Sequence, residues 1–197
     1  IKMTTLDLKQ IQINSAIELF SNGEINQALE AVQDLFKEYP NEPVLFNIRG
    51  ACFADLGQLD IAVKNYKEAI SIKPDYAKAH FNLAGSLYDL GQLKAAVESY
   101  KETLEIEPGY AEAYNNLGNV FQELKQANSA VQSYKKALEI KPDYVAAQYS
   151  LGNTFMELGQ LDEAVKSYKA AIKLKPDFVE AINNLGITFF KLHQLDD

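Results

Sequence analysis

Asparagine recurs at a fixed spacing through most of the sequence, and its amide is the clearest candidate for specific chemistry. One row of evenly spaced places reads Asn14, Ile48, Asn82, Asn116, Ser150 and Asn184. The neighbouring row reads Ile13, Asn47, Phe81, Asn115, Tyr149 and Asn183, and the further amides Asn119 and Asn153 follow a little later in their repeats. An amide offers both a donor and an acceptor, which match the N–H and C=O groups of an extended peptide. These amides therefore predict a surface that binds polypeptide backbone.

The amide rows also have a simpler interpretation, in which they are inherited, solvated and without function. Asparagine is a mediocre helix former because its side chain competes for backbone hydrogen bonds. So many of them on one helical face therefore favour a binding role. Within that role, Phe81 and Tyr149 are the expected apolar anchors, and Lys78, close to Asn82, is a further expected peptide contact.

No residues in the sequence are spaced for catalysis, for a cofactor or for a metal ion. The two histidines, His80 and His193, lie far apart in the sequence, and no serine or cysteine nucleophile is placed beside them by the pattern. Cys52 occupies a place that holds small residues elsewhere, so it is interpreted as a buried filler. No glycine-rich phosphate loop occurs. The chain is therefore not expected to be an enzyme, and no cofactor is expected.

The charge of the chain restricts its partners. A formal net charge of −8 argues against nucleic acid and favours neutral or basic partners. Carboxylates recur with the same period one helical turn beyond the amides, at Asp55, Asp89, Glu123 and Glu157. This acidic edge favours ligands that contain lysine or arginine, although it can equally serve solubility. The sequence contains no run of about 18 apolar residues, so no membrane partner is expected.

The elements that must position these residues follow the same period. Five prolines stand at equal intervals, at Pro40, Pro74, Pro108, Pro142 and Pro176. They divide the chain into an extension at 1–8 and units at 9–42, 43–76, 77–110, 111–144 and 145–178, with a partial unit at 179–197. Small residues recur in register, as in Ala28, Ala62, Ala96, Ala130 and Ala164, and allow helices to approach closely.

Each unit is predicted to contain two helices joined by a tight turn. The apolar residues have helical spacing, and Gly23, Gly57, Gly91 and Gly159 lie where a left-handed residue ends the first helix. Lys125 and His193 take the place of this glycine in the other units. Asn41, Asp75, Asp143 and Asp177, which follow the prolines, are the expected N-caps of the next unit. No unit can bury its apolar face alone, so the prediction is an all-α array of stacked units.

The period, the glycine, alanine and proline framework and the phrase Asn115-Asn116-Leu117-Gly118-Asn119 resemble tetratricopeptide repeats. The resemblance covers the chain from residue 9 onward. It implies a right-handed superhelical α-solenoid in which the first helix of each unit lines a concave groove. The amide row resembles the asparagine ladder in the repeat arm of O-linked N-acetylglucosamine transferases, which holds substrate backbone. That likeness carries over to Asn82, Asn116 and Asn184, less closely to Asn14, and is interrupted at Ile48 and Ser150.

Two functions follow from this resemblance. In the first, the chain is a scaffold that binds an extended, neutral or basic peptide in its groove. In the second, it is the substrate-recruiting arm of a larger enzyme such as a glycosyltransferase. The lysine- and arginine-rich clamp of repeats that bind chaperone tails is missing. The last helix is expected to lack its covering partner and so to allow self-association. The sequence assigns no compartment, although it favours a soluble protein of the cytoplasm.

Overall fold

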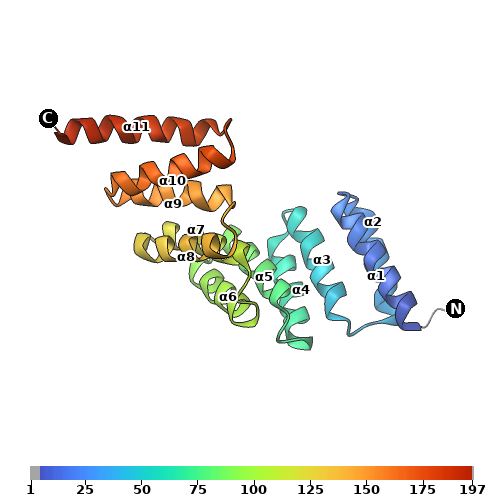
Figure 1. Ribbon diagram of the computed structural model, residues 1–197. Coiled ribbons are helices and arrows are strands. Elements are labelled where there is room, and N and C mark those ends of the chain that lie inside the picture. The colour runs from blue at the N-terminus through green and yellow to red at the C-terminus, as the bar shows by residue number, and fades with distance from the viewer. Residues whose placement is uncertain (1–4, 197) are drawn as a thin grey trace. The chain divides into compact units, whose positions relative to one another are not determined.

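The computed structural model describes residues 5–196, and every regular element in that range is an α-helix (Figure 1). The all-α fold is therefore confirmed. The chain divides into two compact units, Ile1–Ile106 and Glu107–Asp197. The helices of the first unit are α1 (Thr5–Ser21), α2 (Ile25–Glu38), α3 (Pro43–Asp55), α4 (Leu59–Ile72), α5 (Ala77–Asp89) and α6 (Leu93–Ile106). Those of the second unit are α7 (Ala111–Glu123), α8 (Ala127–Ile140), α9 (Val145–Glu157), α10 (Leu161–Leu174) and α11 (Val179–Asp196).

Within each unit, the helices pack as pairs and the pairs stack. We call the odd-numbered helices first helices and the even-numbered ones second helices. In the first unit α3 packs on α4 and α5 on α6, while the first helices α1, α3 and α5 also contact one another in order. The second unit repeats the arrangement with α7 to α11. Each first helix thus has a second helix on one side and another first helix beside it.

The turns between paired helices use the left-handed backbone that the sequence predicts. Gly57 has φ +71°, and the following amide, Gln58 N, donates to Phe53 O at 2.8 Å. Lys125 adopts the same conformation without being glycine, with φ +59°. A side chain makes this conformation unfavourable, so the α7–α8 turn carries a local strain that the glycine turns avoid.

Two local expectations differ from the structure. The helices do not begin at the residue after proline: the N-caps of α3, α5 and α9 are Glu42, Tyr76 and Tyr144, so Asn41, Asp75 and Asp143 lie outside the capping position. No turn forms at His193, because α11 continues through it to Asp196. His193 does not adopt the positive φ that ends the first helix at Lys125 and at the glycine turns. The first helix, α1, begins at Thr5, before the first repeat expected from residue 9.

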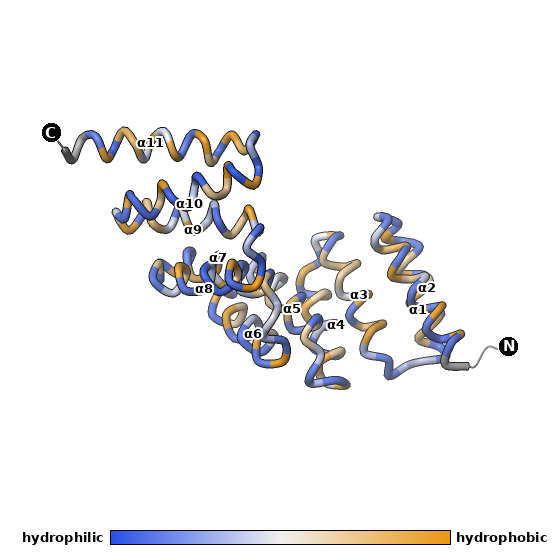
Figure 2. Tube along the Cα trace, viewed as in Figure 1, coloured by the Kyte–Doolittle hydropathy of each residue, from blue (hydrophilic) through white to orange (hydrophobic). Residues whose placement is uncertain are grey.

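Hydrophobic and hydrophilic residues alternate along the helices rather than gathering in one segment (Figure 2). In the part of the chain that the structure describes, no helix has both the length and the apolar character needed to cross a membrane. The apolar residues form a core inside each unit. One buried cluster spans Ile13 to Cys52 in the first unit, and another spans Ala130 to Ala181 in the second.

In two helix pairs of the second unit, a glycine of the first helix lies directly against a tyrosine ring of the second helix. A Cβ atom added to Gly118 would lie 2.5 Å from the ring of Tyr134, and one added to Gly152 would lie 2.7 Å from the ring of Tyr168. Both rings are fully buried and cannot swing into solvent. The pairs α7–α8 and α9–α10 therefore depend on the absence of a side chain at these two positions.

The Gly118→Ala variant should lose about 1–3 kcal/mol of unfolding free energy, because the new methyl group displaces the buried ring of Tyr134. Gly186 occupies the same repeat position in α11, where an added Cβ meets nothing within 4 Å. Gly186→Ala should therefore gain about 0.5–1 kcal/mol from helix propensity. Urea unfolding followed by circular dichroism measures both. Equal changes in the two variants would contradict the packing described here.

Candidate functional site

In the first unit, the amides of neighbouring first helices bind each other directly. Asn82 on α5 donates its Nδ2–H to Oδ1 of Asn47 on α3 at 3.0 Å. Asn47 is only 8% exposed and Ile48 beside it is also buried. Asn47 therefore holds the Asn82 side chain in place, and neither Asn47 nor Ile48 is accessible to a ligand. On α1, Asn14 is exposed and accepts a hydrogen bond from Gln10 at 2.9 Å. Of the predicted amides in this unit, Asn14 and Asn82 are the accessible ones.

The predicted aromatic anchor Phe81 lies beside the Asn82 amide on α5. Its ring packs edge-on against Tyr100 of α6, with 5.7 Å between the ring centroids. The ammonium of Lys78 lies 5.2 Å from the centre of the Phe81 ring, within the range of a cation–π contact. Phe81 is only partly buried, so a ligand can still reach its ring. The structure thus brings Lys78, Phe81 and Asn82 together on one helix face.

In the second unit, Asn153 on α9 joins three helices. Its Oδ1 accepts from the hydroxyl of Tyr168 on α10 at 2.7 Å and from Nδ2 of Asn184 on α11 at 2.9 Å. Nδ2 of Asn184 also lies 3.2 Å from the hydroxyl of Tyr149. The Tyr149 ring packs on Phe178 at 4.8 Å and on Tyr168 at 6.1 Å. Three predicted site residues, Tyr149, Asn153 and Asn184, therefore form one polar cluster.

The remaining predicted amides of the second unit differ in exposure. Asn115 is 5% exposed and donates to Oδ1 of Asn116 at 3.2 Å. It is therefore buried and holds the Asn116 side chain, and it is not itself accessible to a ligand. Asn116 is partly exposed, and so is Asn119, whose Oδ1 accepts from the Tyr134 hydroxyl at 2.8 Å. Asn183 is exposed on α11 and is not part of the Asn153 cluster.

The tyrosine hydroxyls that hold these amides were not predicted as site residues. Tyr134 and Tyr168 recur with the repeat period, but the sequence suggests only that their rings fill the core. The structure adds that each ring passes over its glycine and places its hydroxyl on the amide one residue further along, at Asn119 or Asn153. The recurring tyrosine and the asparagine 15 residues before it were the available signal.

The acidic edge occupies the last residue of four first helices. Asp55, Asp89, Glu123 and Glu157 end α3, α5, α7 and α9, and all four are exposed. A carboxylate is unfavourable at a helix C-terminus, where the backbone dipole is already negative, and costs roughly 0.3–1 kcal/mol. These four positions therefore carry a small stability cost, which neutral residues would avoid.

Two of the residues considered for catalysis, His80 and Cys52, are buried. Nε2 of His80 lies 2.9 Å from the carbonyl of Pro74, and its ring is buried. Burial raises the pKa of the Cys52 thiol to about 11, so this thiol is a poor nucleophile. Within residues 5–196, no three histidine, cysteine, aspartate or glutamate side chains lie close enough together to hold a metal ion.

Comparison with known proteins gives a family match over most of the chain and relatives over shorter stretches of it. A family profile described as TPR repeat matches residues 50–88, 84–125, 123–159 and 152–192. The peroxisomal targeting signal receptor of Candida glabrata is 30% identical over 76 residues, which are 39% of this chain and 13% of that protein. The small glutamine-rich tetratricopeptide repeat-containing protein 2 of Mycosarcoma maydis is 35% identical over 68 residues, 34% of this chain and 19% of that protein. The chain thus spans less than a fifth of either relative.

Among solved structures, the crystal structure of MamA superimposes with a TM-score of 0.75. The superposition covers 91% of this chain and 99% of that one at 24% identity. At this identity the likeness concerns the fold alone. It agrees with the helical repeat architecture described above.

The Tyr168→Phe variant should lose about 1 kcal/mol of unfolding free energy at pH 8, because the hydroxyl bound to Asn153 is removed. Burial raises the pKa of Tyr168 to about 12, whereas an unfolded tyrosine has a pKa of about 10. The contribution of this group to stability is complete below pH 10 and is lost as the pH rises to about 12. Since the variant has no such group, its deficit relative to wild type should shrink over this interval. Denaturant titrations at pH 8 and pH 11 test this, and a deficit that stays constant would contradict it.

Proposed function

The chain belongs to the tetratricopeptide repeat family, and on that premise we propose that it is a protein-interaction scaffold that binds an extended polypeptide. The binding surface is the amide-bearing face of its first helices. The observation that carries the proposal is that amides of successive first helices are hydrogen-bonded to each other, as in Asn82 with Asn47 and Asn184 with Asn153. A relative named as a targeting signal receptor supports a role in binding other proteins.

The fixed amides retain hydrogen-bonding capacity for a ligand. An asparagine side chain has two N–H donors and a carbonyl oxygen with two lone pairs. Asn82 uses one donor in its bond to Asn47, and among the described residues its own carbonyl oxygen accepts no bond. A ligand backbone can take the remaining donor and the oxygen. Because the bond to Asn47 already holds the side chain, little rotamer entropy is lost when the peptide binds.

The spacing of the first helices matches an extended ligand. Neighbouring packed helices lie about 8–10 Å apart, and an extended chain rises about 3.3 Å per residue. The spacing between two neighbouring first helices therefore corresponds to roughly three ligand residues. The three first helices of either unit are separated by two such spacings, which correspond to roughly six ligand residues. Affinity would come from many contacts of about 1 kcal/mol each, with the rings of Phe81 and Tyr149 as apolar anchors.

The acidic edge supports a proposal about the charge of the ligand. Four carboxylates at helix C-termini lower stability slightly, and a basic ligand that binds beside them would recover this cost. Negative charge along a binding face also speeds the encounter with basic partners at low ionic strength. We therefore propose neutral or basic segments as the ligands.

A library of peptides of about 15 residues, from acidic to basic, should be captured selectively by the wild-type chain and at least tenfold less well by Asn82→Ala/Asn116→Ala/Asn184→Ala. The variant removes three accessible amides while leaving the glycine and tyrosine packing in place. Fluorescence polarisation of the selected peptides gives the affinities, and thermal unfolding shows whether the variant is folded.

The matched control is Asn26→Ala/Asn128→Ala, which removes two exposed asparagines of second helices. It should bind as wild type does. Equal capture by all three proteins, or equal loss in the control and the triple variant, would contradict the proposed site.

Neutralising three of the four carboxylates of the acidic edge, with Asp55→Asn, Asp89→Asn and Glu157→Gln, should have two opposite effects. Unfolding free energy should rise by about 1–2 kcal/mol in total, since three carboxylates leave helix C-termini. Association with basic peptides should slow severalfold at low salt and become less salt-dependent. Stopped-flow association at two salt concentrations and urea unfolding measure the two effects. Unchanged association rates would contradict a role of the acidic edge in ligand binding and would mean that it serves only solubility.

A further inference from the structure

Arg49 is the single arginine of the sequence, and it occupies a place that holds leucine in later repeats. The corresponding residues Leu83, Leu117 and Leu151 are buried in the core. Its neighbour on α4, Asn65, likewise replaces the serines found at 99, 133 and 167. The second repeat thus exchanges a leucine–serine pair for an arginine–asparagine pair at a core position.

The guanidinium of Arg49 is held on three sides. Its carbon lies 4.6 Å from the ring centre of Phe36 and 5.2 Å from that of Phe46. Its Nε–H donates to Oδ1 of Asn65, whose own Nδ2–H donates to Ile61 O at 2.8 Å. These contacts fix both the plane and the direction of the guanidinium.

The remaining donors of Arg49 have no partner among the residues that the structure describes. Among the described residues, its Nη–H groups make no hydrogen bond and no carboxylate forms an ion pair with it. Burial lowers the pKa of Arg49, while the Glu68 carboxylate acts in the opposite direction. Because the guanidinium is only half-buried, these donors remain accessible to an acceptor group of a ligand.

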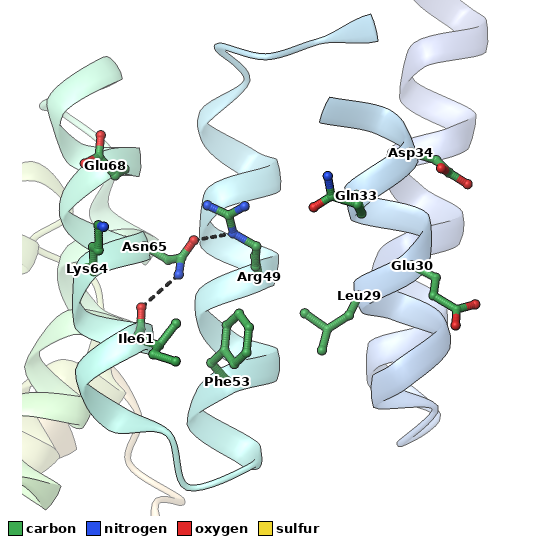
Figure 3. A pocket seen from close by; sticks show the side chains of 10 residues that line it. All are labelled: Leu29, Glu30, Gln33, Asp34, Arg49, Phe53, Ile61, Lys64, Asn65 and Glu68. Atoms are coloured by element: carbon green, nitrogen blue, oxygen red, sulfur yellow. Dashed lines mark hydrogen bonds between the residues drawn. The ribbon is translucent and has the colours of Figure 1, made fainter. Parts of the chain in front are cut away.

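These donors face a hollow of about 730 Å³ on α2, α3 and α4 (Figure 3). Figure 3 places the apolar side chains Leu29, Phe53 and Ile61 on one side of the guanidinium, contributed by the three helices in turn. Glu68 lies on the opposite side. All of these residues belong to the first unit, and none of them is a member of its amide rows.

From this arrangement we propose that the hollow binds a free apolar α-amino acid. The carboxylate accepts two hydrogen bonds from Arg49, in the bidentate geometry that guanidinium favours. The ammonium group lies toward Glu68, and the side chain packs against Leu29, Phe53 and Ile61. The ammonium group and the side chain of the amino acid are both attached to its α-carbon. They can therefore extend in opposite directions from the carboxylate, one toward Glu68 and the other toward the apolar residues. A simple anion fits less well because Glu68 would repel it.

The single arginine makes a direct test possible. In a ¹H–¹⁵N spectrum of the full chain, the Nε–Hε groups of arginine give one signal, that of Arg49. Titration with leucine should shift this signal and the δ1 methyl signal of Ile61 in parallel, reaching saturation at millimolar concentration or below, on the order of the affinity expected for a small ligand. The methyl signal of Ile140 in the second unit should not move.

Three ligand analogues test the three contacts. N-acetylleucine lacks the ammonium, leucinamide lacks the carboxylate and glycine lacks the side chain. Each should bind at least tenfold more weakly than leucine. Binding of N-acetylleucine as tight as that of leucine would overturn the contact with Glu68. It would mean that the hollow binds the C-terminal residue of a peptide and not a free amino acid. Equally tight binding of leucinamide would overturn the role of Arg49.

The protein variant is Arg49→Leu, which restores the residue found in the later repeats and should keep the fold. Leucine should then cause no saturable shift of the Ile61 methyl signal, while Arg49→Lys should retain weakened binding. Unchanged binding by Arg49→Leu, or the absence of any saturable shift in wild type, would overturn the proposal.

Discussion

The contact between a tyrosine ring and a glycine at three of the helix pairs, α3–α4, α7–α8 and α9–α10, is the constraint on which the rest of the structure depends. Tyr66, Tyr134 and Tyr168 lie so close to Gly50, Gly118 and Gly152 that no Cβ fits between ring and backbone. The contact sets the distance between paired helices. In the second unit it also brings the Tyr134 and Tyr168 hydroxyls to Asn119 and Asn153. Core packing and the orientation of the candidate site are thus determined by the same side chain.

That coupling changes the interpretation of the amide rows. From the sequence, an asparagine on a helix face is either free to bind a ligand or idle in solvent. The structure adds a third state, in which an amide is already bound to a neighbouring helix and keeps part of its capacity. Asn82 and Asn184 are in this state. Such amides cost less to order on binding than solvated ones, and this favours the scaffold function proposed for the chain.

The fold could be predicted because its signals act on the backbone. Proline ends a helix, glycine allows positive φ, and both recur with one common period. The site was harder to predict because equivalent positions differ in burial: Asn14 is exposed, whereas Ile48 in the same row is buried. The hydroxyl partners of Asn119 and Asn153 lie on the paired helix, so predicting them requires the distance between two helices, which no local pattern supplies. Arg49 was visible as a break in a row of leucines, but its unpaired donors emerge only from the packing of α2, α3 and α4.

The central claim is that the amide-bearing face of the first helices contacts bound polypeptide, and the side-chain amide signals of asparagine report on it most directly. With a peptide selected for binding, the Nδ2–H₂ signals of Asn82, Asn116 and Asn184 should shift in a ¹H–¹⁵N spectrum. Those of Asn26 and Asn128, exposed on second helices, should stay in place. Shifts confined to the second helices, with the first-helix amides unmoved, would contradict the account.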